Sequence, residues 1–337
     1  MYDIFMKKAD VYDESKMLNH RQEEDFMEAK FHLPGLRRNY PLNITFLRLF
    51  QEHPEYFREG VKIGSFYGEF PTSLWNGGRN SHPDMCDEKF INMCIGQMNG
   101  QGIPIRYTYT NMLIEEEDLS DPYCNYCLQA AHNGMNGVIV VSPLLEEYVR
   151  KNYPKMSIVS STCKGIKGVD GVNEELKKDY ALVVLDYNLN NQFEELEKIT
   201  DKGRCEILVN ALCAPNCPAR AAHYKNVSRN QKIIAKSLQN PKEPMGTLEP
   251  WKFEGCKGGR FVYAITDSCT YVSPEDIWEK YVPMGFHNFK LEGRNDHILN
   301  VIELYCMYMV KPEYQGKVRF YLYSKMEQLK IIQINMP

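Results

Sequence analysis

The sequence lacks the segments that would place it in or across a membrane. Its first ten residues contain neither the apolar core nor the cleavage site of a signal peptide. No stretch approaches the ~20 consecutive apolar residues of a membrane-spanning helix. It also lacks an excess of either charge, because 40 basic and 44 acidic residues leave a net charge of −4, which argues against a broad nucleic-acid surface. We therefore expect a cytoplasmic protein that contacts no membrane.

Internal repeats are absent, and no glycine-rich dinucleotide fingerprint follows the first apolar run. What recurs is a short apolar run, a polar loop and a helical stretch. Near-continuous apolar runs of this length are typical of parallel strands buried on both faces. The eight runs are Val61–Tyr67, Ile103–Thr110, Gly137–Ser142, Met156–Ser161, Tyr180–Leu185, Glu206–Ala211, Arg260–Ile265 and His287–Glu292.

Helical patterns fill most gaps between these runs. They are Pro143–Asn152 after the N-cap Ser142, Gln192–Ile199, Ser273–Tyr281 and His297–Met309. Eight strands alternating with helices predict an α/β fold, a (β/α)8 TIM-type barrel, and a doubly wound open sheet is the alternative.

The expected barrel occupies residues 59–310. Residues 1–58 form an N-terminal extension with a leading helix, and residues 311–337 a C-terminal tail. A polar, basic insertion over about 218–259 separates the sixth run from the seventh. Long loops of this kind serve as lids or ligand-binding segments, or else they are solvated excursions.

Chemistry in such a barrel comes from side chains just past the strand ends. The candidate catalytic residues at these positions are Arg79, Asn111, Asn210, His223, Glu292 and Arg294. Guanidinium groups bind carboxylate or phosphate through paired hydrogen bonds, so we expect an anionic substrate, a small molecule or a nucleotide. His223 is either an acid–base group or a structural residue.

Eleven cysteines are many for a reducing compartment, where they act as free thiols or as metal or cluster ligands. Cys213 and Cys217 follow the sixth run directly, and Cys256 and Cys269 could complete a set of four ligands. The alternative is that these residues are buried free thiols. The Cys124 and Cys127 pair has no second pair nearby, so we interpret it as structural or incidental.

The order of motifs resembles the collagenase-like peptidase family U32 over about residues 60 to 300. The last run, Phe289–Arg294, matches the Lys-(Ile/Leu)-Glu-Gly-Arg signature of that family, and Glu206–Cys213 is similar to its Glu-x-Phe-Val-His-Gly-Ala-x-Cys segment. Ser161-Thr162 resembles its Ser-Thr-Gln motif, and Asn111 its asparagine after the second run. Asn210 and Trp278 stand where many members have His and Cys.

This resemblance implies a barrel that binds a four-iron (4Fe-4S) cluster through four cysteines, the first of which corresponds to Cys213. Family members are implicated in anaerobic hydroxylation of ubiquinone precursors and of RNA bases. The sequence therefore predicts an iron–sulfur-dependent enzyme of this type. The alternative is a cluster-free barrel that acts as a hydrolase or lyase, or that binds a second barrel protein. A protease is a weaker alternative, because no nucleophile–base pair is evident.

Overall fold

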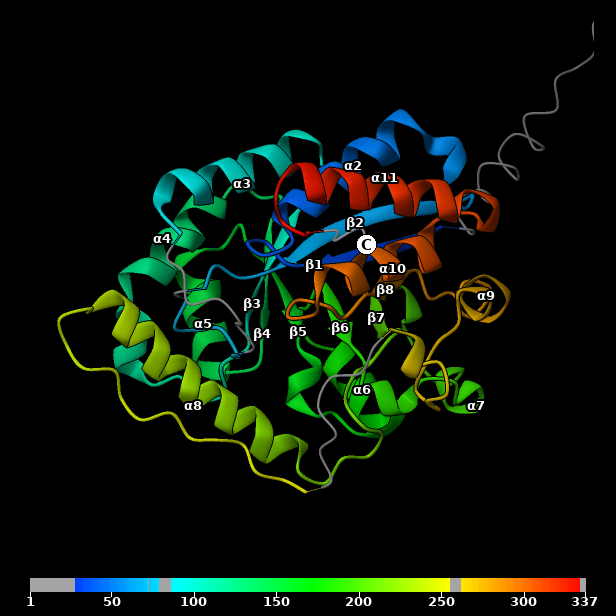
Figure 1. The fold of residues 1–337 in the computed structure, drawn as a ribbon. Helices are drawn as coiled ribbons and strands as arrows, with labels where there is room; N and C mark the ends of the chain where they lie inside the picture. Colours follow the sequence, from blue (N-terminus) through cyan, green and yellow to red (C-terminus); the bar gives the residue numbers. More distant parts are fainter. Residues whose placement is uncertain (1–27, 72, 79–85, 255–261, 334–337) are drawn as a thin grey trace, which may run out of the picture.

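Eight parallel strands close into a barrel in chain order (Figure 1), in a computed structural model that describes residues 28–71, 73–78, 86–254 and 262–333. The strands are β1 (Ala29–Pro34), β2 (Val61–Gly68), β3 (Ile105–Tyr109), β4 (Gly137–Val140), β5 (Ser157–Ser160), β6 (Leu182–Val184), β7 (Cys205–Leu208) and β8 (Asn288–Lys290). The closed sheet confirms the predicted (β/α)8 class and excludes the open, doubly wound alternative.

The strand predictions are wrong at two places: they omit the first strand of the barrel, and they include a seventh run that is no strand in its described part. The barrel takes its first strand, β1, from the segment predicted as an extension, and β1 pairs with both β2 and β8. The predicted seventh run lies partly outside the described residues, and Val262–Ala264 forms a 3-10 turn. The polar residues Lys30 and His32 interrupt the apolar character of β1. The long insertion therefore lies between β7 and β8.

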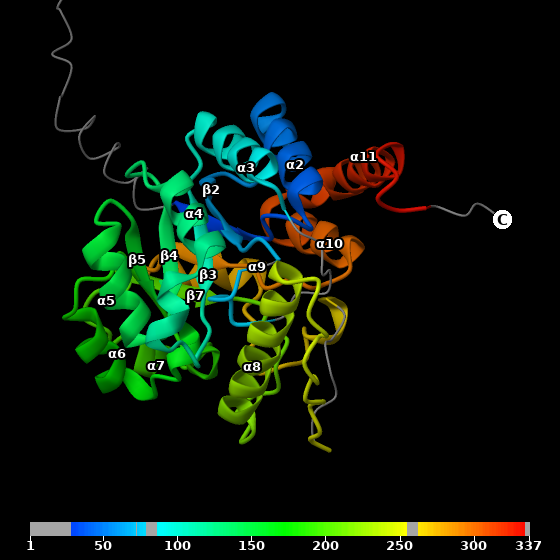
Figure 2. The same cartoon turned by 90° about the vertical axis from the view of Figure 1, so that its left-hand side faces the viewer.

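Helices surround the barrel (Figures 1 and 2). They are α2 (Tyr40–Glu52), α3 (Glu88–Gly100), α4 (Pro122–Ala131), α5 (Pro143–Asn152), α6 (Gly168–Leu176), α7 (Phe193–Leu196), α8 (Arg220–Gln239), α9 (Pro274–Asp276), α10 (Ile298–Met309) and α11 (Gln315–Gln328). Ser142 caps α5 as predicted, accepting a hydrogen bond from the amide of Leu145. In the described part of the chain, no helix combines the length and apolarity that crossing a membrane requires.

The predicted C-terminal tail contains α11, which lies beside α2 in Figure 1 and packs on α2 and α10. Its residues Val318, Leu322 and Met326 are buried. The tail is therefore part of the helical layer around the barrel.

The interior of the barrel is divided between two kinds of side chain. Tyr67, Ile139, Val159 and Val184 form an apolar cluster on one side. Charged and polar side chains fill the other side and come from β1, β2, β3, β7 and β8; they are His32, Ser65, Arg106, Glu206 and Lys290. Barrel interiors are usually filled by branched apolar residues, so the polar half indicates a functional site.

Candidate active site at the barrel mouth

A pocket of about 330 Å³ opens at the carboxyl ends of the strands, where barrel enzymes place their active sites. Its floor includes Tyr67 and Lys290, and hydroxyl groups of Thr108, Thr110 and Ser161 line its wall. The remaining lining residues are Ile139, Thr162, Cys163, Leu208, Leu212, Glu292, Gly293, Arg294, Asn295 and Asp296.

Directly at this floor lies the buried charge cluster, which we define as His32, Arg106, Glu206 and Lys290. The Glu206 carboxylate is fully buried, and its oxygens lie 2.6 Å from Arg106 Nη1 and 3.1 Å from Lys290 Nζ. His32 Nε2 lies 3.5 Å from the same carboxylate. Two cations, Arg106 and Lys290, thus share one carboxylate. His32 adds no charge at neutral pH, because its pKa is lowered to about 3.

Burial and the neighbouring Arg106 lower the pKa of His32 to about 3, so its imidazole is neutral. Burial and Arg106 also lower the pKa of Lys290 to about 8, although Glu206 acts in the opposite direction. Burial alone would raise the pKa of Glu206, but Arg106 and Lys290 hold it well below its usual range. The cluster therefore carries a surplus positive charge at neutral pH, shared between two buried cations.

Arg294 lines the pocket and pairs with Glu69. Its Nη1 donates to Glu69 and, at 2.7 Å, to Thr108 Oγ1, which in turn donates to Glu69. The Glu292 carboxylate accepts a hydrogen bond from the amide of Leu212 at 2.9 Å. The structure thus places the predicted pair Glu292 and Arg294 together in the pocket.

Two predicted asparagines use their amide groups to join loops at the mouth. Asn210 donates to the carbonyl of Glu292 and accepts from its amide, which joins the ends of β7 and β8. Asn111 donates to the carbonyls of Leu74 and Ser228. Neither residue lines the pocket as described, and a catalytic role for them stays a prediction.

The insertion helix α8 crosses the mouth. Gln231 donates to the carbonyls of Pro71 and Ser73 after β2, and Lys232 pairs with Asp118 at 2.6 Å. At the other end, Arg220 pairs with Asp186 at 2.8 Å. Figures 1 and 2 show the following segment returning beside α8. The helix is thus fixed over one side of the mouth by polar side chains.

Three predicted residues lie apart from the pocket or outside the described residues. His223 sits on α8, where its ring stacks on Trp251 with centroids 4.7 Å apart, and it does not line the pocket. Arg79 and Cys256 lie outside the described residues.

The loops that carry Cys213, Cys217 and Cys269 each contact one turn, Tyr187–Asn191. Tyr187 contacts the Cys213 thiol, and Asn188 accepts from the amide of Asn216, in the loop between Cys213 and Cys217. Asn191 donates to the carbonyl of Cys269, whose side chain is exposed. In the described residues, the ligand atoms of these three cysteines do not gather as closely as a single metal ion requires.

An iron–sulfur cluster needs more ligands than these three residues provide. The described residues supply three thiols on neighbouring loops of the mouth, whereas a cluster commonly takes four thiolates. Cys124 and Cys127 are fully buried on α4, and burial raises the pKa of both thiols, which agrees with a structural role.

Four functional side chains were missed by the sequence interpretation: His32, Arg106, Glu206 and Lys290. The available signal was a charged residue inside a strand, since Arg106 lies in β3, Glu206 in β7 and Lys290 in β8. Charged residues are almost never fully buried unless paired, so charges in several strands of one barrel predict an interior cluster.

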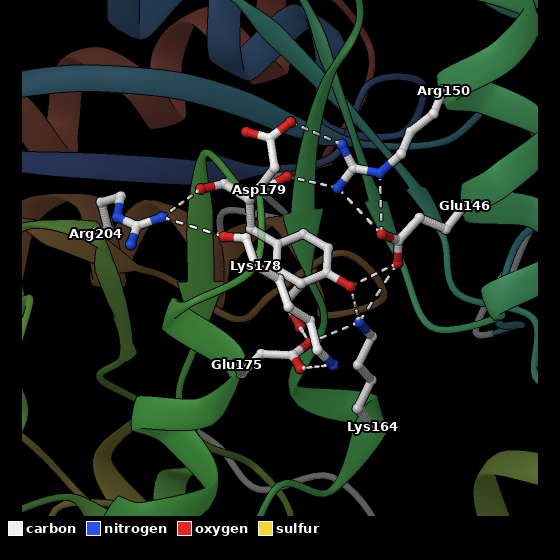
Figure 3. Close-up of polar contacts among 9 residues, drawn as sticks. Glu146, Arg150, Lys164, Glu175, Lys178, Asp179 and Arg204 are labelled. Carbon is white, nitrogen blue, oxygen red and sulfur yellow. Dashed lines mark hydrogen bonds and ion pairs between the residues drawn. The ribbon is translucent and has the colours of Figure 1, made fainter.

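A larger groove of about 900 Å³ lies on the outside of the barrel, between α5 and α6. Its polar side chains form the outer charge network, which we define as Glu146, Arg150, Lys164, Glu175, Lys178, Asp179 and Tyr180. Figure 3 shows the charged members paired with one another. Their mutual pairing favours the mouth pocket as the active site.

No family model matches the chain, and the comparisons with known proteins give one similar sequence and one similar structure. An uncharacterized protease of Methanocaldococcus jannaschii is 24% identical over 183 residues, which is 52% of this chain and 50% of the relative. The chain thus spans about half of that relative. A solved U32 peptidase structure gives a TM-score of 0.46 at 14% identity, covering 87% of this chain and 97% of the other. That structural likeness is too weak to support a functional argument.

Proposed function

We propose that this chain, a relative of the U32 peptidases, is an enzyme that binds a small anionic substrate in the mouth pocket. The observation that carries the proposal is the surplus positive charge at the pocket floor, where Arg106 and Lys290 share Glu206. Of the two cations, Lys290 lines the pocket, and it shares its buried counter-charge with Arg106. Because an uncompensated buried charge is costly, an anionic group in the pocket stabilises this region.

The pocket volume limits the substrate. A volume of about 330 Å³ lies at the lower end of the range for small-molecule sites. The pocket therefore suits a small carboxylate, an aromatic acid or one nucleotide base with its phosphate at the rim. The Ser161 hydroxyl on the wall accepts from the amide of Cys163 and can donate its own proton to such a group.

The protease named among the relatives is a weaker model for this pocket. Ser161 accepts from the amide of Cys163, and Thr162 donates to the carbonyl of Leu185. No histidine lines the pocket as far as the chain is described. A nucleophile activated by an adjacent base, which peptide hydrolysis by a serine or cysteine enzyme requires, is therefore not evident in this pocket.

Titration calorimetry with benzoate, inorganic phosphate and adenosine monophosphate tests the proposal. We expect at least one of them to bind, and we expect Lys290→Met to weaken its binding about tenfold or more, a loss typical of a charge-assisted hydrogen bond. The matched control is Lys89→Met, on the exposed face of α3, which should bind as the wild type does. Absence of binding by all three, or equal binding by every variant, contradicts the proposal.

Iron–sulfur-dependent hydroxylation is a second proposal, supported by the contacts that Cys213, the loop before Cys217 and the Cys269 backbone make with Tyr187–Asn191. A bound cluster would supply one-electron transfer beside the pocket. Anaerobic purification with iron, sulfide and visible absorption measurements tests it. We expect the double variant Cys213→Ser with Cys217→Ser to lose the absorption, and unchanged absorption removes these residues as ligands.

A further inference from the structure

The Lys290 side chain combines burial with access to the pocket. It ends β8, its residue is 8% exposed, and it lines the pocket floor. Its Nζ lies 3.1 Å from Glu206 Oε1 and 4.2 Å from the centre of the Tyr67 ring. A desolvated amine beside other cations, with one side open to a substrate pocket, is the arrangement that makes a lysine nucleophilic.

The groups that face this amine come from every neighbouring element. Arg106 on β3 and Arg294 after β8 disfavour its charged form, whereas Glu206 on β7 favours it. His32 on β1 is neutral at physiological pH. Burial is the largest influence, and together these groups lower the pKa of Lys290 to about 8. At pH 8 about half of the amine is neutral, against under about 1% for a lysine with the ordinary pKa of about 10.4.

We propose that the Lys290 amine forms an imine with a carbonyl group of the anionic substrate. The inference rests on the proposed function, because the substrate must bind by its anionic group in the pocket that Lys290 and Arg294 line. The substrate class is therefore a small oxo acid, which carries a carbonyl and an anion within the dimensions of this pocket.

The reaction balances with groups that line the pocket. The neutral amine attacks the carbonyl carbon, an N–C bond forms, and the C–O π electrons move to oxygen, which takes a proton. The nitrogen then loses a proton, and a second proton reaches the oxygen. As this oxygen leaves as water, the nitrogen lone pair forms the C=N bond of an iminium. Overall, one ammonium and one carbonyl give one iminium and one water. Asp296 at the rim suits the proton transfers, because burial raises the pKa of its carboxyl group.

Reductive trapping tests the inference. The wild type, Lys290→Arg and Lys89→Arg are incubated at pH 8 with pyruvate and sodium cyanoborohydride, and modified lysines are located by peptide mass spectrometry. We expect Lys290 to be modified at least about tenfold faster than Lys89, since the difference in neutral fraction is on the order of 100-fold and burial slows access. Lys290→Arg keeps the positive charge but has no amine at this position, so it should lose this modification, whereas Lys89 should be modified in it as slowly as in the wild type.

Pyruvate binding is measured in parallel by calorimetry, so that two failures can be separated. Binding without modification of Lys290 overturns the imine and leaves the proposed function intact. If pyruvate does not bind and Lys290 is not modified, the inference is also overturned. The proposed function is overturned by a different result: absence of binding by benzoate, phosphate and adenosine monophosphate.

Discussion

Two charge groups in this molecule differ in how completely their members are paired. In the outer charge network, three cations face three carboxylates, and Tyr180 links both sides by accepting from Lys164 at 2.7 Å and donating to Glu146 at 2.6 Å (Figure 3). In the buried charge cluster, two cations share Glu206. The outer network is internally balanced and suits a structural role, whereas the buried charge cluster is unbalanced next to the pocket where we propose that an anion binds.

Removal of the shared carboxylate should have the largest effect. Glu206→Gln leaves Arg106 and Lys290 buried without a counter-charge, and we expect it to lower the free energy of unfolding by about 3–5 kcal/mol. Its outer counterpart Glu175→Gln should cost about 1–2 kcal/mol, because the partner Lys178 is exposed. Urea denaturation measures both, and equal losses would contradict the distinction between the two groups.

The second-largest effect should be the pH dependence that Lys290 of the buried charge cluster gives to the free energy of unfolding. The pKa of Lys290 falls from 10.5 to about 8 on folding, so the unfolded chain binds more protons between these values. The contribution of Lys290 to the unfolding free energy therefore rises with pH across this window, by up to about 3 kcal/mol. Subtracting the profile of Lys290→Met isolates it, and identical profiles would refute the shift.

The outer network responds at the acid end. Burial acts against the shift, but Lys164 and Lys178 lower the pKa of Glu175 from 4.5 to about 2. The stability that these contacts contribute is present above pH 4.5 and is lost as the pH falls toward 2. Glu175→Gln should remove this part of the acid dependence.

Replacing one lysine in each group by methionine should produce a smaller difference in unfolding free energy. Lys164→Met leaves Glu146 and Glu175 without their shared cation, and we expect a loss of about 1–2 kcal/mol. Lys290→Met removes a surplus charge and leaves Arg106 paired with Glu206, so stability should stay unchanged or rise by about 1 kcal/mol. Thermal or urea unfolding decides this, and a larger loss for Lys290→Met would reverse the comparison.

The smallest effect concerns a hydroxyl group of the outer network. Tyr180→Phe removes the link between Lys164 and Glu146 and should cost about 1 kcal/mol in urea denaturation. It should leave the binding of anions at the mouth pocket unchanged in calorimetry, because Tyr180 does not line that pocket. A variant with weakened binding would show that the two groups are coupled.

The sequence was sufficient for the barrel class, because seven of its strands carry apolar runs that parallel pairing requires. It was insufficient for β1, where His32 is polar yet faces the barrel interior and bonds to Ser65. It identified Glu292 and Arg294 through a motif at the end of β8. It did not identify Arg106 or Glu206, since their meeting depends on side-chain direction across a closed sheet, which apolar patterning does not report.

The account depends on the unbalanced charge at the pocket floor, and the protonation of Lys290 reports that charge directly. Nuclear magnetic resonance of protein labelled at lysine side chains, with the Lys290 signal assigned through Lys290→Met, measures its titration. We predict a midpoint near pH 8 in the free protein and a higher midpoint when an anion occupies the pocket. A midpoint at the ordinary lysine value of about 10.4 in both states would contradict the account.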